Sequence, residues 1–158
     1  MLDNLYREII LDHYRSPKNR GEVEDPDIRT KGVNPLCGDE LELTIQLDGD
    51  LIHGIKFDGH GCSISQASAS MLTERVRGLR LSEAGKLVEL VKEMLKGSTE
   101  VNLEELGDLE ALQGVRNFPV RIKCATLAWN ALKVGIEDGA NSHKHAGPDS
   151  HETVFTEH

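Results

Sequence analysis

The stretch ELELTIQLDGDLIHGIKFDGHGCSISQASASM, residues 40–71, decides the fold. In residues 40–47 an apolar residue alternates with a polar one without a break, which predicts a strand with one buried face. The turn residues DGD follow at 48–50, and residues 51–57 are expected to return as the partner strand of an antiparallel hairpin. After Cys62 the apolar residues recur at helical spacing as far as Val76, which predicts a helix. The chain therefore changes from strand to helix at a cysteine.

The remaining sequence adds helices on both sides of this hairpin. A helix is expected at about residues 3–15, ended by Pro17, and a short strand ends at the Asn34–Pro35 turn signal. Further helices are predicted from Ser82, as N-cap, to Gly97, as C-cap, and from Pro119 to Gly139, with one or two helical turns between them. Trp129 on the last helix is expected to lie in the core. The order predicts an α+β fold, in which helices pack on one face of a small antiparallel sheet of about three strands.

Length and composition indicate one ordinary globular domain. The chain has 158 residues, of which 28% are charged and 38% hydrophobic. We expect the domain to span residues 1–139 and a polar, flexible tail to span 140–158. No stretch approaches the length of a membrane span, and the acidic residues near the start do not suit a signal peptide, so we expect a cytoplasmic protein. The net charge of −9 argues against a nucleic-acid partner, because phosphate contacts need clustered Lys and Arg.

The three cysteines each stand at the edge of a predicted element. Cys37 precedes the first hairpin strand, Cys62 begins the helix after the hairpin, and Cys124 falls near the start of the last helix. A hairpin brings its two open ends together, so Cys37 and Cys62 should be neighbours. If Cys124 packs against the same corner, three thiolates converge, and Asp39 can supply a fourth ligand for zinc or iron. The alternative is that one or two of the cysteines are buried packing residues.

The sequence is also compatible with other functions for these residues. A purely structural zinc site is one, although the glycine-flanked ligands suggest a site more exposed than such sites usually are. A cysteine hydrolase with His60 or His53 as base is another, but no oxyanion motif is evident. Arg121, close to Cys124, either steers an anionic group toward the thiols or belongs to a solvated helix face.

Three blocks of this sequence resemble a known family. The segments NPLCGDELELTIQLDGD, FDGHGCSISQASASM and FPVRIKCATLAW are similar to the cysteine blocks of the U-type iron–sulfur cluster assembly proteins (IscU, SufU and the N-terminal domain of NifU), in the same order. The segment ILDHYRSPKNRG resembles their N-terminal helix and the following loop. Within the family, the amino-acid sequence of these blocks is most similar to the SufU branch. Lys123 stands where the Isc branch has a histidine, and FPVRIK replaces that branch's chaperone-binding motif.

This resemblance implies a function and a set of partners. It implies a metal site built from Cys37, Asp39, Cys62 and Cys124, which holds Zn²⁺ or, as an alternative, iron or a transient [2Fe–2S] cluster. The implied activity is zinc-dependent acceptance of persulfide sulfur from a cysteine desulfurase that carries pyridoxal phosphate, and we expect Cys37 to be the acceptor. The alternative is a scaffold that builds a [2Fe–2S] cluster and passes it to apo-proteins or downstream carriers. Neither reading makes the chain a conventional stand-alone enzyme, and neither involves nucleic acid or a membrane.

Overall fold

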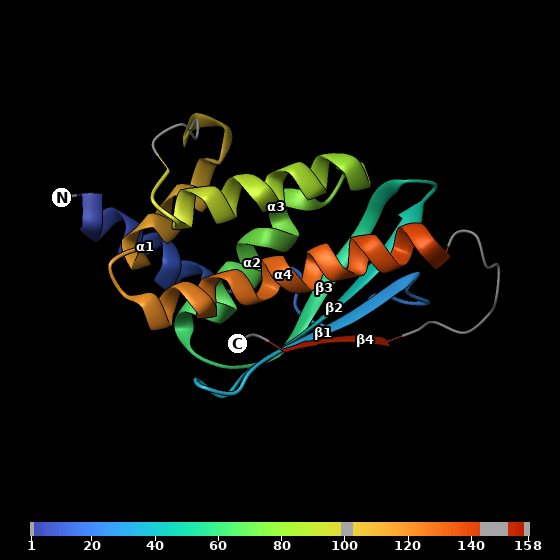
Figure 1. Cartoon of the computed structure of the whole chain (residues 1–158), viewed down its shortest axis with the longest axis horizontal. Coiled ribbons are helices and arrows are strands. Elements are labelled where there is room, and N and C mark those ends of the chain that lie inside the picture. Colours follow the sequence, from blue (N-terminus) through green and yellow to red (C-terminus); the bar gives the residue numbers. More distant parts are fainter. Residues whose placement is uncertain (1, 99–102, 143–151, 157–158) are drawn as a thin grey trace.

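The computed structural model describes residues 2–98, 103–142 and 152–156, and Figure 1 shows how they are arranged. The elements are, in chain order, α1 (Leu2–Arg15), β1 (Ile28–Asn34), β2 (Asp39–Asp48), β3 (Leu51–His60), α2 (Ser63–Val76), α3 (Leu81–Leu95), η1 (Leu103–Glu105), η2 (Gly107–Val115), α4 (Pro119–Ser142) and β4 (Glu152–Thr156). Across these described ranges no helix has both the length and the apolar character that crossing a bilayer requires.

One sheet carries all four strands, in the order β3-β2-β1-β4. β2 pairs antiparallel with both β3 and β1, which confirms the predicted α+β fold with an antiparallel sheet of about three strands. Gly49 and Asp50 connect β2 to β3, and Gly49 has a φ of +63°, which suits glycine in a tight hairpin turn. The register pairs Glu40 with His60, so the open ends of the hairpin meet as expected.

A fourth strand, which the sequence analysis does not predict, lies at the other edge of the sheet. β4 pairs in parallel with β1, from Arg29 opposite Glu152 to Val33 opposite Thr156. The helix before it, α4, continues to Ser142, beyond the predicted end at Gly139. Residues 143–151 and 157–158 lie outside the described residues, so the flexibility expected for the tail from 140 to 158 stays a prediction.

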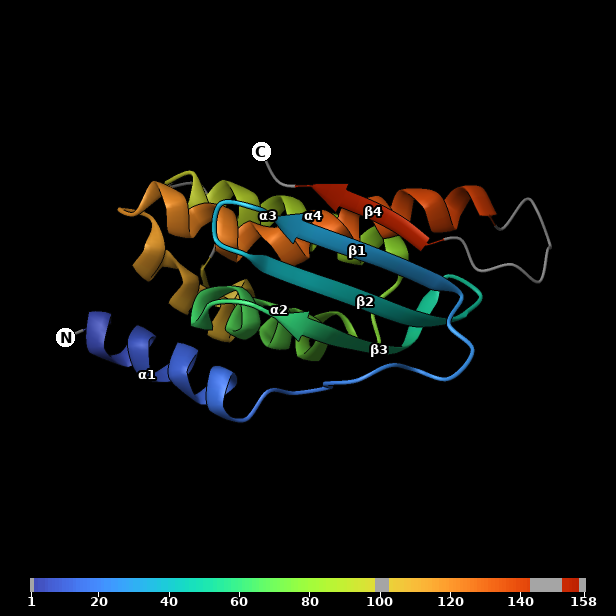
Figure 2. The same ribbon diagram turned by 90° about the horizontal axis from the view of Figure 1, so that it is seen from below.

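The helices cover one face of this sheet. α2 and α4 pack against the strands and α3 packs on α4, while α1 lies beside α2 (Figures 1 and 2). The inward residues Leu41, Leu43 and Ile45 of β2 are fully buried beneath these helices, as the alternation predicts. Burial of this kind contributes roughly 1.5–3 kcal/mol for each large apolar side chain.

Two glycines let α4 approach β1 closely. A Cβ atom at Gly32 would lie 3.0 Å from Leu127 Cδ1, and one at Gly135 would lie 3.1 Å from Ile28 Cγ2. The close approach places Trp129 in the core with 0% exposure, as predicted, and its Nε1–H donates to Ser68 Oγ at 3.0 Å. α4, which carries Cys124, is therefore fixed firmly against the sheet.

The ends of α3 differ slightly from the prediction. The N-cap is Arg80, not Ser82, and Glu83 accepts a hydrogen bond from the Arg80 N–H at 3.0 Å. At the other end Lys96 is the C-cap, and Gly97 follows it with a φ of +89°, a conformation that glycine adopts without strain.

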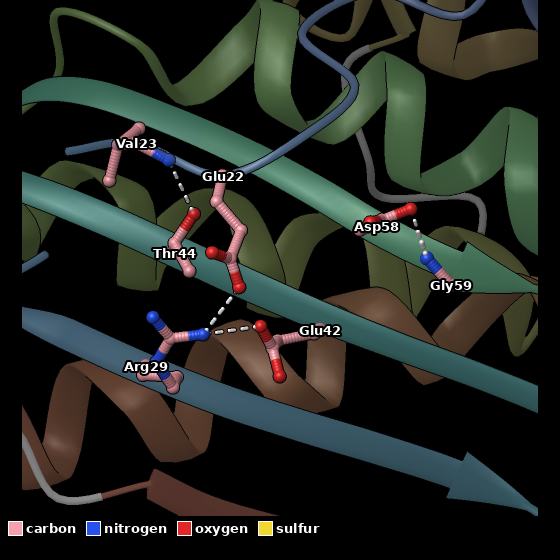
Figure 3. Close-up of polar contacts among 7 residues, drawn as sticks. All are labelled: Glu22, Val23, Arg29, Glu42, Thr44, Asp58 and Gly59. Atoms are coloured by element: carbon pink, nitrogen blue, oxygen red, sulfur yellow. Dashed lines mark hydrogen bonds and ion pairs between the residues drawn. The ribbon is translucent and has the colours of Figure 1, made fainter.

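The segment between α1 and β1 is tied to the outer face of the sheet by polar contacts (Figure 3). The Arg29 guanidinium bonds to Glu22 and to Glu42, and its hydrogen bond to Glu22 lowers the pKa of that carboxyl. The Val23 N–H donates to Thr44 Oγ1 at 3.0 Å, in a buried position. This segment therefore covers part of the outer face through polar contacts.

Candidate metal centre

The candidate site lies where three segments meet at one end of the molecule. The turn at residues 35–38, the start of α2 and the start of α4 lie together at that end in both views (Figures 1 and 2). Cys37 sits in the turn, Asp39 is the first residue of β2, Cys62 is the N-cap of α2, and Cys124 follows the first turn of α4. The sequence expectation that the cysteines flank element ends is therefore met for all three.

Three of the four predicted ligands come together directly. The sulfurs of Cys37 and Cys124 lie 3.3 Å apart. Together with a carboxylate oxygen of Asp39 they form a group in which every ligand atom lies within 4.8 Å of the others. Thiolate and carboxylate ligands at such spacing suit Zn²⁺ or iron, and closing the group onto one cation requires only small side-chain rotations.

Asp39 supplies the evidence that this group suits a cation. The residue is fully buried, and its Oδ1 accepts a hydrogen bond from the Cys62 N–H at 2.8 Å. Its other oxygen, Oδ2, is also buried and has no hydrogen-bond partner among the described residues. A buried carboxylate oxygen without a partner is costly, and a cation beside the two sulfurs would satisfy it.

Cys62 is next to this group without being part of it. Its backbone N–H is bonded to Asp39, yet its sulfur is not within 4.8 Å of the ligand atoms of Cys37, Asp39 and Cys124 together. The side chain is half-buried and lines an open pocket that it shares with Cys37. Its place as a fourth ligand therefore remains a proposal.

The electrostatics at Cys124 favour a bound positive charge. Burial raises the pKa of the Cys124 thiol, and the contact with Cys37 and the charges of Cys62 and Asp39 raise it further. All these groups disfavour a thiolate at this position as long as no cation is present. A metal ion would reverse that balance, because a coordinating thiol is deprotonated outright.

Two further residues, Asn34 and Gly61, support this site. Asn34, at the end of β1, is fully buried, and its Nδ2 donates to Cys124 Sγ at 3.9 Å. In the sequence, the feature that points to Asn34 is an amide side chain at an inward-facing position of a strand. Gly61 is the other: a Cβ atom there would clash with Asp39 Oδ1 and would lie 2.6 Å from Ser65 Oγ.

We predict that Gly61→Ala weakens zinc binding by roughly ten-fold or more, the usual effect of disturbing a group that orients a metal ligand. The added methyl displaces Asp39 and breaks its hydrogen bond with the Cys62 N–H. Competition with a chromogenic chelator measures the affinity. Gly85→Ala is the matched control, since nothing lies within 4 Å of a Cβ there. An unchanged zinc affinity in Gly61→Ala would contradict this description of the site.

An open pocket gives access to the sulfurs. It has a volume of about 570 Å³ and is lined by Cys37 and Cys62 and by residues 117–121 at the start of α4. Leu36, Phe118 and Val120 lie in or next to this rim and are more than half exposed, at 72%, 59% and 56%. Arg121 lies there too, and the charges of Cys62 and then of Cys124 raise its pKa. The site thus combines solvent-accessible sulfur atoms with exposed apolar side chains and the positive charge of Arg121.

The histidines considered as bases are not members of this ligand group. His60 is 71% exposed, and its Nε2 is 3.4 Å from Glu40 Oε2 on the neighbouring strand. His53 is exposed on β3. Neither belongs to the group of ligand atoms found around Cys37, so the structure offers no support for the hydrolase reading.

Comparisons with known proteins agree with this arrangement. Residues 5–145 match the family model described as the NifU-like N-terminal domain. The chain is 48% identical over 142 residues to the zinc-dependent sulfurtransferase SufU of Bacillus subtilis (strain 168), covering 89% of this chain and 96% of that protein. It is 43% identical over 141 residues to the iron–sulfur cluster assembly scaffold protein IscU of Streptococcus pyogenes serotype M1, covering 89% and 88%.

A solved structure shows the same fold. The iron–sulfur cluster assembly scaffold protein for the SUF system from Fervidobacterium islandicum AW-1 superposes with a TM-score of 0.78 at 36% identity, covering 82% of this chain and 94% of that one. The match of the family model and the identity to SufU and IscU extend over most of the chain. This chain therefore belongs to the family of the NifU-like N-terminal domain, the U-type iron–sulfur cluster assembly proteins.

Proposed function

We propose that this chain accepts persulfide sulfur from a cysteine desulfurase, in a zinc-dependent manner, for iron–sulfur cluster assembly. The observation that carries the proposal is the pair of sulfurs of Cys37 and Cys124, 3.3 Å apart beside the partnerless Oδ2 of Asp39. The relative of 48% identity that is named a zinc-dependent sulfurtransferase supports it. Such a site holds ionised thiols in reach of a partner protein.

Zinc would be held by Cys37, Asp39, Cys62 and Cys124. Bound there, Zn²⁺ supplies the positive charge that keeps the thiols ionised, and it is redox-inert. The fully buried Asp39 and Cys124 provide the fixed side of the site, while the half-buried Cys37 and Cys62 line the pocket. This division between buried and accessible ligands suits a site that must open to a partner.

Cys37 is the acceptor in this proposal. It lies in a turn next to Gly38, which has a φ of +70° and open space where a Cβ atom would lie. The Cys37 thiolate attacks the outer sulfur of the persulfide on the desulfurase cysteine. The new S–S bond forms at Cys37 as the S–S bond of the donor breaks, and the donor cysteine leaves as a thiolate, so sulfur moves without net oxidation or reduction.

Arg121 assists the approach of the persulfide. Its guanidinium is fully exposed at the rim of the pocket, where the charges of Cys62 and Cys124 raise its pKa. A fixed cation at this position attracts an anionic persulfide by simple electrostatics. The exposed apolar side chains of Leu36, Phe118 and Val120 offer the desulfurase a contact surface around it.

The partners follow from this chemistry. The donor is a cysteine desulfurase that carries pyridoxal phosphate, and the sulfur then passes to cluster assembly and finally to apo iron–sulfur proteins or downstream carriers. We propose that the reaction takes place in the cytoplasm, the compartment expected from the sequence.

A scaffold function is the second candidate. The 43% identity to a protein named an iron–sulfur cluster assembly scaffold favours it. Three thiolates and one carboxylate would bind a [2Fe–2S] cluster as cargo, because thiolates serve iron as well as zinc. Anaerobic purification separates the two: one zinc and no visible colour favours sulfur acceptance, whereas a brown protein that contains labile sulfide favours the scaffold.

The rate of alanine formation by a cysteine desulfurase tests the proposal. We expect the wild-type chain to raise this rate and Cys37→Ala, Cys62→Ala, Cys124→Ala and Asp39→Ala not to raise it. His60→Ala is the control, because His60 is exposed and its partner, Glu40, does not belong to the ligand group. A desulfurase rate that the wild-type chain leaves unchanged would refute sulfur acceptance, and the scaffold would then be preferred.

A further inference from the structure

A second group of metal-ligand atoms lies among three helices, away from the cysteines. His13 near the end of α1, Glu74 near the end of α2 and Asp108 in η2 each place a ligand atom within 4.8 Å of the other two. These helices pack against one another, and Figure 2 shows α1 alongside α2. Glu74 is twelve residues after Cys62 along α2, about 18 Å at the rise of an α-helix. The two groups are therefore separate.

His13 is buried, and one of its ring nitrogens is engaged by a hydroxyl group. Its side chain is 8% exposed, and its Nδ1 lies 2.8 Å from Ser70 Oγ. Ser70 Oγ also accepts the Lys18 N–H at 2.8 Å, and a hydroxyl oxygen can accept twice. His13 Nδ1–H can therefore donate to Ser70, which leaves the lone pair on Nε2. This is the arrangement by which histidine ligands of metals are usually fixed.

The other ring nitrogen, Nε2, faces Asp108. Nε2 of His13 lies 4.0 Å from Asp108 Oδ2, which is too far for a hydrogen bond. Two ligands each about 2.1 Å from one cation stand roughly 3–4 Å apart, so the spacing suits a shared ion. Glu74 and Asp108 are exposed and can rotate by the small amount that remains.

We propose that His13, Glu74 and Asp108 form a second metal site, which binds one divalent first-row cation through one imidazole and two carboxylates. Carboxylate ligands suit Mn²⁺, whereas the thiol group suits softer ions such as Zn²⁺. The bound ion links α1 to α2 and η2 and so stabilises the docking of the N-terminal helix. This site is independent of the proposed sulfur acceptance.

Mn²⁺ is the probe, because its affinity for thiolate ligands is low. Electron paramagnetic resonance of free Mn²⁺ measures its affinity for the full chain. We expect Glu74→Gln combined with Asp108→Asn to weaken binding roughly ten-fold or more. Glu8→Gln combined with Glu105→Gln removes the same charge at exposed positions outside the group and should leave the affinity close to wild type.

A second readout locates the ion directly. Bound Mn²⁺ should broaden the ring resonances of His13 in the nuclear magnetic resonance spectrum at concentrations that leave those of the exposed His53 sharp. If both double variants lost Mn²⁺ affinity to the same extent, net charge alone would explain the loss, and the proposal would be overturned. So would His13 resonances that Mn²⁺ leaves unbroadened. Sulfur acceptance in the Glu74 and Asp108 variant should match wild type, so failure of either proposal is visible separately.

Discussion

Cys124→Ala is expected to lower the zinc affinity of this protein by well over 100-fold. Disturbing a group that only supports a ligand already costs about 10–100-fold, and Cys124 is itself a fully buried member of the ligand group. Its sulfur lies 3.3 Å from that of Cys37, so the substitution also removes a close contact of the proposed acceptor. Chelator competition measures the affinity, and the wild-type rate of desulfurase stimulation should be lost with it.

The control for this prediction lies two residues further along α4. Thr126→Ala removes a side chain of similar size whose hydroxyl donates within the helix to the Lys123 carbonyl at 3.3 Å. It should retain zinc affinity and desulfurase stimulation. The fluorescence of Trp129, the single tryptophan of the chain, reports whether either variant has lost its core. A folded Cys124→Ala protein that binds one zinc as tightly as wild type would contradict the proposed ligand set.

Trp129→Ala is expected to cost about 3–5 kcal/mol of the free energy of unfolding, the usual range for removing a large aromatic side chain from a core. Trp129 is among the largest fully buried side chains, and it contacts α2 through its hydrogen bond to Ser68. Because small domains are stable by only about 5–15 kcal/mol, this single change brings the protein close to unfolding.

Urea denaturation followed by circular dichroism measures this cost, since the variant has no tryptophan fluorescence. Trp129→Phe is the matched comparison: it keeps most of the volume and loses the hydrogen bond, so it should cost roughly 1–2 kcal/mol. Ser68 still donates to the Ala125 carbonyl in both variants. A Trp129→Ala protein destabilised by less than about 1 kcal/mol would show that α4 is not fixed to the sheet in the way described here.

The central part of the fold could be predicted because its signals are local. The alternation predicts that Leu41, Leu43 and Ile45 of β2 face inward, and the two-residue turn closes the hairpin, although the register shifts between Gln46 and Leu47. The same pairing brings Cys37 near Cys62, so a neighbourhood of two cysteines follows from the strand pattern alone. Resemblance to a family then supplies what the pattern leaves open, the convergence of Cys124 and Asp39.

The parts that were not predicted depend on contacts between distant segments. β4 is a short segment in a polar tail, and it forms a strand by pairing with the free edge of β1. Asn34 reads as a turn residue before Pro35, and only the packing of α4 places it against Cys124. His13, Glu74 and Asp108 are far apart in sequence, and no local pattern joins them.

The central claim is that Cys37, Asp39, Cys62 and Cys124 surround one cation. X-ray absorption fine structure at the zinc edge of the zinc-loaded protein tests it most directly. We predict three sulfur neighbours at about 2.3 Å and one oxygen neighbour at about 2.0–2.2 Å. Cys62→Ala should show two sulfurs under the same conditions. A wild-type spectrum with two or fewer sulfurs, or one that Cys62→Ala leaves unchanged, would contradict the claim.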